Sequence, residues 1–146
     1  MTTKAIDLFA GAGGFTLSAH KAGVDVVAAV EFDKAAANTY KKNFIETSNH
    51  NIDLRAGPEH GDINNVDPKE LRESLKLRPG ELDLILGGPP CQGFSTHRIK
   101  NAGVNDPRNA LLLRYFEFVH EFKPKAFLVE NVAGLLWKRH KVYRIS

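Results

Sequence analysis

The architecture of this chain can be read from the segment Ala5-Ile6-Asp7-Leu8-Phe9-Ala10-Gly11-Ala12-Gly13-Gly14-Phe15. Residues 5–9 form a short, mainly apolar run closed by glycines, and residues 15–22 carry a helical pattern that stops at Gly23. This order predicts a strand, a glycine-rich turn and a helix. Glycines in such a turn let the backbone pass close to a ligand, which the first amide groups of the helix can meet. The dinucleotide-binding fingerprint is narrowly missed, because Thr16 stands where its third glycine would be.

The alternation of strand and helix continues along the chain. Residues 26–32 form a second apolar run, after which Asp33 is placed to cap a helix that ends near residue 44. Residues 45–67 are rich in Asn, His, Asp, Gly and Pro, which predicts a loop with one short strand near residues 52–55. The remaining elements are expected at residues 68–77 (a helix capped by Asp67), 82–86 (a strand), after Asp106-Pro107 (a helix) and 126–129 (a strand).

Strands that are apolar on both faces and joined by helices belong to a parallel sheet that helices cover on two sides. The sequence therefore predicts an α/β fold, doubly wound, with a mostly parallel sheet and helices on both faces. The length of 146 residues, with 42% hydrophobic and 25% charged residues, is typical of one soluble globular domain.

Composition excludes several classes of protein. No apolar run approaches the ~18 residues of a membrane helix, and Asp7 interrupts any signal-type start, so a cytoplasmic protein without a membrane partner is expected. Cys91 is the single cysteine, which excludes a disulfide scaffold and a Cys-rich zinc site, and no metal is expected. Residues 1–97 hold 10 basic and 13 acidic residues, whereas residues 98–146 hold 10 and 4. The basic second half fits a polyanionic partner or a solvated surface equally well.

Unusual polar residues fall where the strands end, which is the edge at which such sheets bind ligands. Glu31 ends the second strand, 20 residues after Gly11, where a carboxylate can accept hydrogen bonds from both hydroxyls of a ribose. Asp62, expected near the end of the third strand, could accept a bond from the amino group of a purine. Together they favour a nucleoside cofactor; the alternative is a surface turn with solvated acids.

The segment Gly87-Gly88-Pro89-Pro90-Cys91-Gln92-Gly93-Phe94-Ser95 follows the fourth strand. Prolines stiffen this loop and glycines let it project, so Cys91 is presented as a nucleophile, although a lone cysteine is often a buried filler. Glu130 ends the fifth strand and is a candidate proton donor, because partial burial would raise the pKa of its carboxyl. The alternative is a solvated Glu130 beside a helix capped by Asn131.

These segments resemble, in order, the successive signatures of the DNA cytosine-5 methyltransferases, with the Pro-Pro-Cys-Gln motif highly specific and the glycine motif moderately so. The resemblance runs from residue 5 to about residue 136, in segments 7–15, 61–63, 88–95 and 130–132 and at Glu31. It implies a Rossmann-like fold that binds S-adenosylmethionine and methylates C5 of cytosine in DNA. Cys91 would attack C6 of a flipped cytosine, and Glu130 would contact N3. The implied cofactor-binding residues are Phe9, Ala10, Gly11, Gly13, Gly14, Glu31, Phe32, Asp62, Ile63 and Pro89.

The chain departs from the family after Glu130-Asn131-Val132. There the family continues with further strands, an Arg-bearing segment, a target-recognition domain and a returning C-terminal helix, and residues 133–146 carry none of these signatures. Residues 1–146 are thus expected to be a partial catalytic and cofactor-binding domain whose sheet is incomplete at one edge. Because the strand at 126–129 has the apolar pattern of an interior strand, the chain is expected to self-associate or to need a second polypeptide.

Three functions are left open at this stage. The first is cytosine-5 methylation of DNA by a chain that a second polypeptide complements, with residues 92–105, including His97, Arg98 and Lys100, gripping DNA phosphates. The second is a catalytically silent fragment that binds the cofactor. The third is cytosine-5 methylation of transfer RNA by a related branch of the family.

Overall fold

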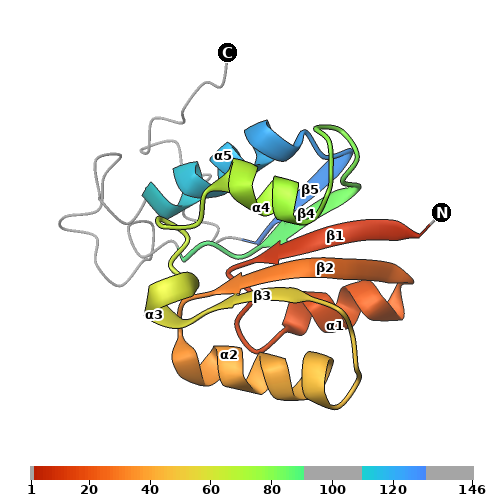
Figure 1. Ribbon diagram of the computed structural model, residues 1–146, viewed down its shortest axis with the longest axis vertical. Coiled ribbons are helices and arrows are strands. Elements are labelled where there is room, and N and C mark those ends of the chain that lie inside the picture. Colours follow the sequence, from red (N-terminus) through yellow and green to blue (C-terminus); the bar gives the residue numbers. More distant parts are fainter. Residues whose placement is uncertain (1, 91–109, 131–146) are drawn as a thin grey trace.

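The computed structural model describes residues 2–90 and 110–130. In these ranges the chain forms one parallel sheet with helices on both faces (Figure 1). The strands are β1 (Thr3–Leu8), β2 (Val24–Glu31), β3 (Asp53–Ala56), β4 (Leu84–Gly87) and β5 (Ala126–Val129). The helices are α1 (Gly14–Lys21), α2 (Lys34–Tyr40), the π-helical η1 (Lys41–Glu46), α3 (Gly57–His60), α4 (Pro68–Ser74) and α5 (Ala110–Phe122). The predicted α/β class is confirmed.

The strand order is β3-β2-β1-β4-β5, and every neighbouring pair is parallel. The chain builds outward from β1 through β2 to β3, and it then crosses to the other side of β1 for β4 and β5. The direction of winding reverses between β1 and β4, so the loops after these strands diverge and leave a crevice at their carboxyl ends. The glycine turn after β1 and the Pro-Pro segment after β4 both begin at this crevice.

The core lies on both faces of β1, as the alternation of strand side chains requires. Ile6 and Leu8 pack with Phe118 in the cluster beneath α4 and α5. Ala5 faces the opposite side and packs with Ala19 of α1. All of these residues are buried, with α4 and α5 on one face of the sheet and α1 and α2 on the other (Figure 1). Each large apolar side chain buried in this way contributes about 1.5–3 kcal/mol.

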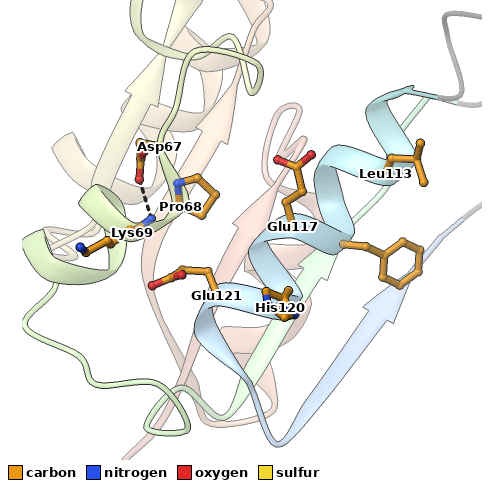
Figure 2. Close-up of a pocket in the computed structure, with 8 residues that line it drawn as sticks. Asp67, Pro68, Lys69, Leu113, Glu117, His120 and Glu121 are labelled. Atoms are coloured by element: carbon orange, nitrogen blue, oxygen red, sulfur yellow. Dashed lines mark hydrogen bonds between the residues drawn. The ribbon is translucent and has the colours of Figure 1, made fainter. Parts of the chain in front are cut away.

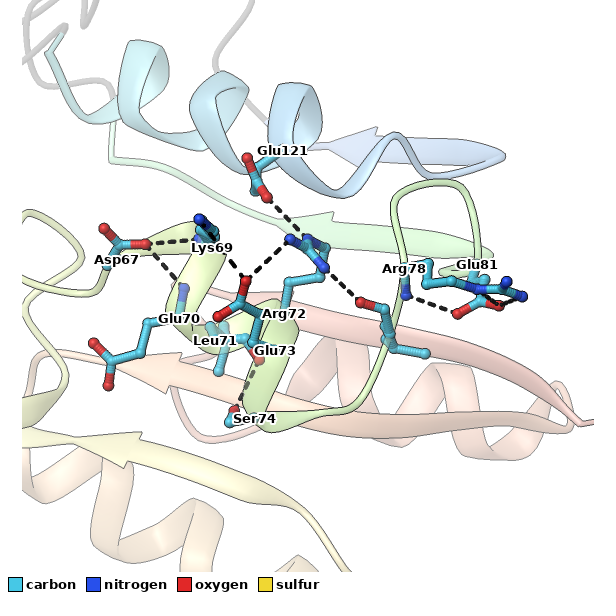
Figure 3. Close-up of polar contacts among 11 residues, drawn as sticks. Asp67, Lys69, Glu70, Leu71, Arg72, Glu73, Ser74, Arg78, Glu81 and Glu121 are labelled. Carbon is cyan, nitrogen blue, oxygen red and sulfur yellow. Dashed lines mark hydrogen bonds and ion pairs between the residues drawn. The ribbon is translucent and has the colours of Figure 1, made fainter.

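Two helices begin at the aspartates that the sequence indicates. The Asp33 carboxylate accepts a hydrogen bond of 2.7 Å from the backbone N–H of Ala36. Asp67 Oδ1 accepts bonds of 2.8 Å and 2.9 Å from the backbone N–H groups of Lys69 and Glu70 (Figure 3). Both predicted N-caps are confirmed.

The segment between β2 and α4 differs from its prediction. The helix after Asp33 does not continue as an α-helix to residue 44, because it widens into the π-helical η1. In η1 the ring centroid of Phe44 lies 4.8 Å from that of Tyr40. Residues 45–67 contain the short helix α3 as well as the expected strand. Pro58 occupies its first turn, where the missing N–H of proline costs nothing. Helix α4 ends at Ser74 rather than at residue 77, and β4 begins at Leu84 rather than at residue 82.

Strand β5 forms one edge of the described sheet, as the sequence predicts for an incomplete sheet. Its residues Phe127 and Leu128 are 50% and 45% exposed. Tyr115 of α5 holds β5 to β4, because its hydroxyl lies 3.0 Å from the carbonyl oxygen of Ile85 and 3.1 Å from that of Leu128. Within residues 2–90 and 110–130, no helix combines the length and apolarity that crossing a membrane demands.

Candidate functional site

The turn after β1 has an unusual backbone. Phe9, Gly11 and Gly13 have φ angles of 60°, 57° and 100°. The left-handed conformation costs a non-glycine residue such as Phe9 about 1–2 kcal/mol, and such strain is typical of functional turns. A Cβ at Gly13 would collide with the ring of Phe44, whereas Gly11 has open space beside it. The turn is therefore closely packed against Phe44 at Gly13, while the space beside Gly11 is open.

A buried polar chain fixes helix α1 beneath this turn. Thr16 stands where the dinucleotide fingerprint has its third glycine, and its hydroxyl donates a hydrogen bond of 2.7 Å to Asp7 Oδ2. Its oxygen lies 2.9 Å from the hydroxyl of Tyr40, which donates because the single Thr16 proton goes to Asp7. Burial raises the pKa of Asp7 to about 6, hydrogen bonds from Thr16 lower it in part, and the charge of Glu31 adds a smaller rise. Thr16 therefore holds α1 to β1 and α2 by hydrogen bonds, at the position where a glycine would allow close packing.

Glu31 ties together the loops that follow β1 and β2. Its Oε2 accepts a bond of 2.7 Å from the N–H of Gly11, and its Oε1 accepts one of 2.7 Å from the N–H of Asp33. A carboxylate has about four acceptor positions. The two backbone bonds therefore orient Glu31 and leave it able to accept further hydrogen bonds.

The segment between α3 and α4 lies against the end of β2 and forms another side of the same site. Gly61 packs so closely on the backbone of Glu31 that a Cβ at position 61 would strike the Glu31 carbonyl oxygen. Asp62 Oδ1 accepts bonds of 3.0 Å from both the backbone and the side-chain nitrogen of Asn64. Asp62 therefore follows α3 rather than β3, but it still lies at the carboxyl edge of the sheet.

These parts enclose a cavity of about 540 Å³. Five of the residues expected to bind the cofactor line it, namely Phe9, Glu31, Phe32, Asp62 and Ile63. The other expected cofactor residues, Ala10, Gly11, Gly13, Gly14 and Pro89, are not among the residues that line it. The prediction did not include the remaining lining residues, which are Val30, Asp33, Gly61, Asn64, Gly88, Pro90 and Leu111. The aromatic side chains of Phe9 and Phe32 and the carboxylates of Glu31, Asp33 and Asp62 line this one cavity, which suits an aromatic base with a hydroxylated sugar.

Glu130 lies beside the start of the Pro-Pro segment. Its backbone N–H donates a bond of 2.9 Å to the carbonyl oxygen of Gly87, which continues the pairing of β4 with β5. A Cβ built on Gly88 would lie 3.2 Å from Glu130 Oε2, so the carboxyl group approaches this segment directly. Glu130 is exposed rather than partly buried as expected. Cys91, the basic segment 92–105 and Asp106-Pro107 lie outside the described residues.

A second hollow, of about 630 Å³, lies between α4 and α5 (Figure 2). Lys69, Glu117, His120 and Glu121 bring both signs of charge to it, and Leu113 is an apolar neighbour. None of the residues singled out as cofactor-binding or catalytic lines this hollow, and it lies on a helical face of the sheet rather than at the strand ends. The cavity at the carboxyl edge is therefore the candidate functional site.

Comparison with known proteins adds a family match. The family model described as C-5 cytosine-specific DNA methylase matches residues 3–145. The type II methyltransferase M.AgeI of Thalassovita gelatinovora is 45% identical over 133 residues, which are 91% of this chain and 28% of that protein. The type II methyltransferase M.AquIA of Picosynechococcus sp. is 39% identical over 142 residues, which are 97% of this chain and 53% of that protein. This chain thus spans between about a quarter and about half of the length of these relatives.

Solved structures agree with this match. A protein assigned as a DNA modification methyltransferase, encoded within an E. coli prophage, aligns with a TM-score of 0.73 and 34% identity over 96% of this chain and 35% of its own. The S. pombe Dnmt2 methyltransferase aligns with a TM-score of 0.59 over 90% of this chain and 35% of its own, and its 21% identity supports the fold alone.

Proposed function

Because the chain belongs to the C-5 cytosine-specific DNA methylases, we propose that it forms the cofactor-binding and nucleophile-bearing part of an enzyme that methylates C5 of cytosine in DNA. One observation carries the proposal. The cavity lined by Phe9, Glu31 and Asp62 opens at the carboxyl edge where Glu130 meets the segment that leads to Cys91. A cofactor site, an acid and the segment that precedes the proposed nucleophile thus share one edge of the sheet.

The residues of this cavity fit S-adenosylmethionine. Phe32 is 56% exposed and lines the cavity, so it offers a face on which an adenine ring can stack. Glu31 keeps acceptor capacity for the two ribose hydroxyls, because its two backbone bonds use only part of its lone pairs. The Oδ2 of Asp62, which has no hydrogen-bond partner among residues 2–90 and 110–130, accepts a bond from the exocyclic amino group of the base. When bound, S-adenosylmethionine supplies a methyl group on a positively charged sulfur.

Cys91 and Glu130 make the cytosine ring reactive. The Cys91 thiolate adds to C6, which forms a carbon–sulfur bond and moves the electrons of the C5–C6 double bond onto C5. Glu130 shares a proton with N3, so the negative charge that develops in the ring is neutralised. After C5 has gained its substituent, a base removes the C5 proton, the double bond re-forms and the Cys91 thiolate leaves. The enzyme therefore ends the cycle unchanged.

DNA is the substrate that we infer from this chemistry and from the charge of the second half of the chain. A base inside a duplex cannot be attacked at C6, so the cytosine must leave the stack, at a cost of about a few kcal/mol. Basic residues of the segment 92–105, Arg98 and Lys100 among them, bind phosphates around the extruded nucleotide. We propose that further polypeptide, in the same chain or a separate one, selects the DNA sequence and covers the exposed edge of β5.

A trapping experiment tests the catalytic role. Duplex DNA in which cytosines carry fluorine at C5 is incubated with the chain and S-adenosylmethionine, because the fluorine prevents loss of the C5 substituent and leaves the protein attached. A complex that survives denaturation is expected, and Cys91→Ser should abolish it. An adduct that persists in Cys91→Ser would overturn the assignment of the nucleophile.

The same experiment tests the need for further polypeptide. A chimera is made that joins this chain to the part of the Thalassovita gelatinovora relative outside the match. We expect the chimera to form the adduct far faster than the chain alone, with transfer RNA as a competing substrate that fails to react. Equal rates for chain and chimera would refute the need for further polypeptide, and the lack of an adduct with both would refute the proposed activity.

A further inference from the structure

We infer that Arg114 of α5 is a positioning residue for the cofactor cavity, an inference that rests on the proposed function. Arg114 does not line the cavity. Its Nε donates a hydrogen bond of 2.8 Å to the carbonyl oxygen of Ile63, and its Nη2 donates one of 2.6 Å to that of Val66. Both carbonyls belong to the segment that carries Asp62, so one guanidinium group fastens this wall to α5.

Among the described residues, the other hydrogen bonds of segment 62–66 stay within the segment. The backbone and side-chain nitrogens of Asn64 donate to Asp62 Oδ1, and the N–H of Asn65 donates to the carbonyl oxygen of Asp62 at 2.9 Å. These bonds shape the turn without attaching it to the sheet. Ile63 and Val66 are buried against the core and supply apolar contact. The two bonds from Arg114 also fix the orientation of the segment's backbone, because a planar guanidinium offers donors in a fixed geometry.

Arg114 also connects two walls of the cavity. Leu111, which lines it, stands three residues before Arg114 on α5, so both side chains lie on the same side of the helix. The guanidinium is held in place by an ion pair with Glu117 and by the ring of Phe118, whose centroid lies 5.5 Å from Arg114 Cζ. Its side chain is only 18% exposed. Arg114 therefore sets the spacing between the Leu111 wall and the Asp62 wall.

Arg72 is a matched control for this role. It lies on α4, its side chain is 11% exposed, and its Nε donates a bond of 2.9 Å to Glu121 of α5 (Figure 3). Its Nη1 donates a bond of 2.6 Å to the carbonyl oxygen of Leu77. Arg72 thus makes the same kinds of contact as Arg114, but no residue of α4 lines the cavity.

The test compares Arg114→Met, Arg114→Lys and Arg72→Met in the full chain. Calorimetric titration with S-adenosylmethionine measures affinity, and hydrogen exchange without ligand measures the order of residues 61–66 and 71–77. Arg114→Met should raise the dissociation constant about tenfold and Arg114→Lys less, because lysine keeps one charged donor but not the fork. Arg72→Met should change the dissociation constant less than about twofold. Exchange should quicken at 61–66 in the Arg114 variants and at 71–77 in Arg72→Met.

The outcomes separate this inference from the proposed function. If the unsubstituted chain binds S-adenosylmethionine and both Met variants weaken binding equally, or neither does, Arg114 has only a structural role and the inference is wrong while the function stands. If exchange at 61–66 is unchanged in Arg114→Met, the inference is also wrong. If the unsubstituted chain does not bind, the proposed cofactor is wrong and the positioning role falls with it.

Discussion

The buried carboxyl of Asp7 makes the stability of the fold depend on pH, and Asp7→Asn should remove this dependence. Asp7 is fully buried, and its Oδ1 has no hydrogen-bond partner among the described residues. Burial therefore favours the neutral acid and raises its pKa to about 6 from the ordinary value of 3.8. The unfolded chain releases this proton near the ordinary value, while the folded chain retains it. The stabilisation is thus complete below that value and is lost as the pH rises through about 6.

The size of the effect follows from the two pKa values. The gap between them corresponds to about 3 kcal/mol of unfolding free energy. Carboxylates such as Glu81 and Asp83, whose pKa values are lowered by partners, act in the opposite direction. Both proteins contain them, so they cancel in a comparison. From about pH 3.5 to about pH 7.5 the unfolding free energy of Asp7→Asn should therefore rise by about 2.5 kcal/mol relative to that of the unsubstituted chain.

The assay is urea unfolding followed by circular dichroism, repeated across this pH range for both proteins. The test is how the difference in unfolding free energy between the two proteins changes with pH. Loss of the contact between Asp7 and Thr16 adds a constant to this difference at every pH and leaves its slope unchanged. A difference that stays constant with pH would refute the reasoning, since the pKa of Asp7 would then be equal in the folded and unfolded chains.

Three further predictions, made with four substitutions, are tested by urea unfolding. Gly61→Ala should lose about 1–3 kcal/mol because its Cβ strikes the carbonyl of Glu31, whereas Gly14→Ala has open space and should change stability by less than about 0.5 kcal/mol; equal effects would contradict the steric argument. Asp67→Ala should lose about 1 kcal/mol with the N-cap of α4, a loss that shrinks in strong acid, where the lowered pKa of Asp67 is finally passed; a loss unchanged by acid would contradict it. Tyr115→Phe should cost about 1 kcal/mol, since it removes the hydroxyl that lies within hydrogen-bond distance of the carbonyl oxygens of Ile85 in β4 and Leu128 in β5; a neutral effect would mean that the hydroxyl does not join these strands.

Local signals in the sequence predicted most of the fold. Apolar runs separated by helical patterns gave the five strands in their order, and Asp33 and Asp67 marked helix starts because capping depends on neighbouring residues alone. The short helix α3 was missed, since four residues carry no helical periodicity. The widening of η1 was missed as well, because it depends on the packing of Phe44 under a distant glycine turn.

The sequence predicted the residues of the candidate site that lie near strand ends, and it missed those that come from helix α5. Glu31 and Asp62 were found because polar residues near the carboxyl ends of parallel strands collect at one edge of the sheet, even though α3 separates Asp62 from β3. Leu111 and Arg114 reach the site from a helix about 50 positions further along the chain, and no local pattern marks such a contact. Asp7 did carry a signal, since an acid inside an apolar strand requires a buried partner, which proved to be Thr16.

The central claim is that the cavity at the carboxyl edge binds S-adenosylmethionine, and equilibrium titration of two phenylalanine variants tests it most directly. Phe32 and Phe127 are similarly exposed, at 56% and 50%, but only Phe32 lines the cavity, while Phe127 lies on the edge strand β5. Phe32→Ala should weaken binding of S-adenosylmethionine about tenfold or more through loss of stacking, and Phe127→Ala should leave the affinity unchanged. Binding that is equally strong in Phe32→Ala and in the unsubstituted chain would contradict the assignment of this cavity.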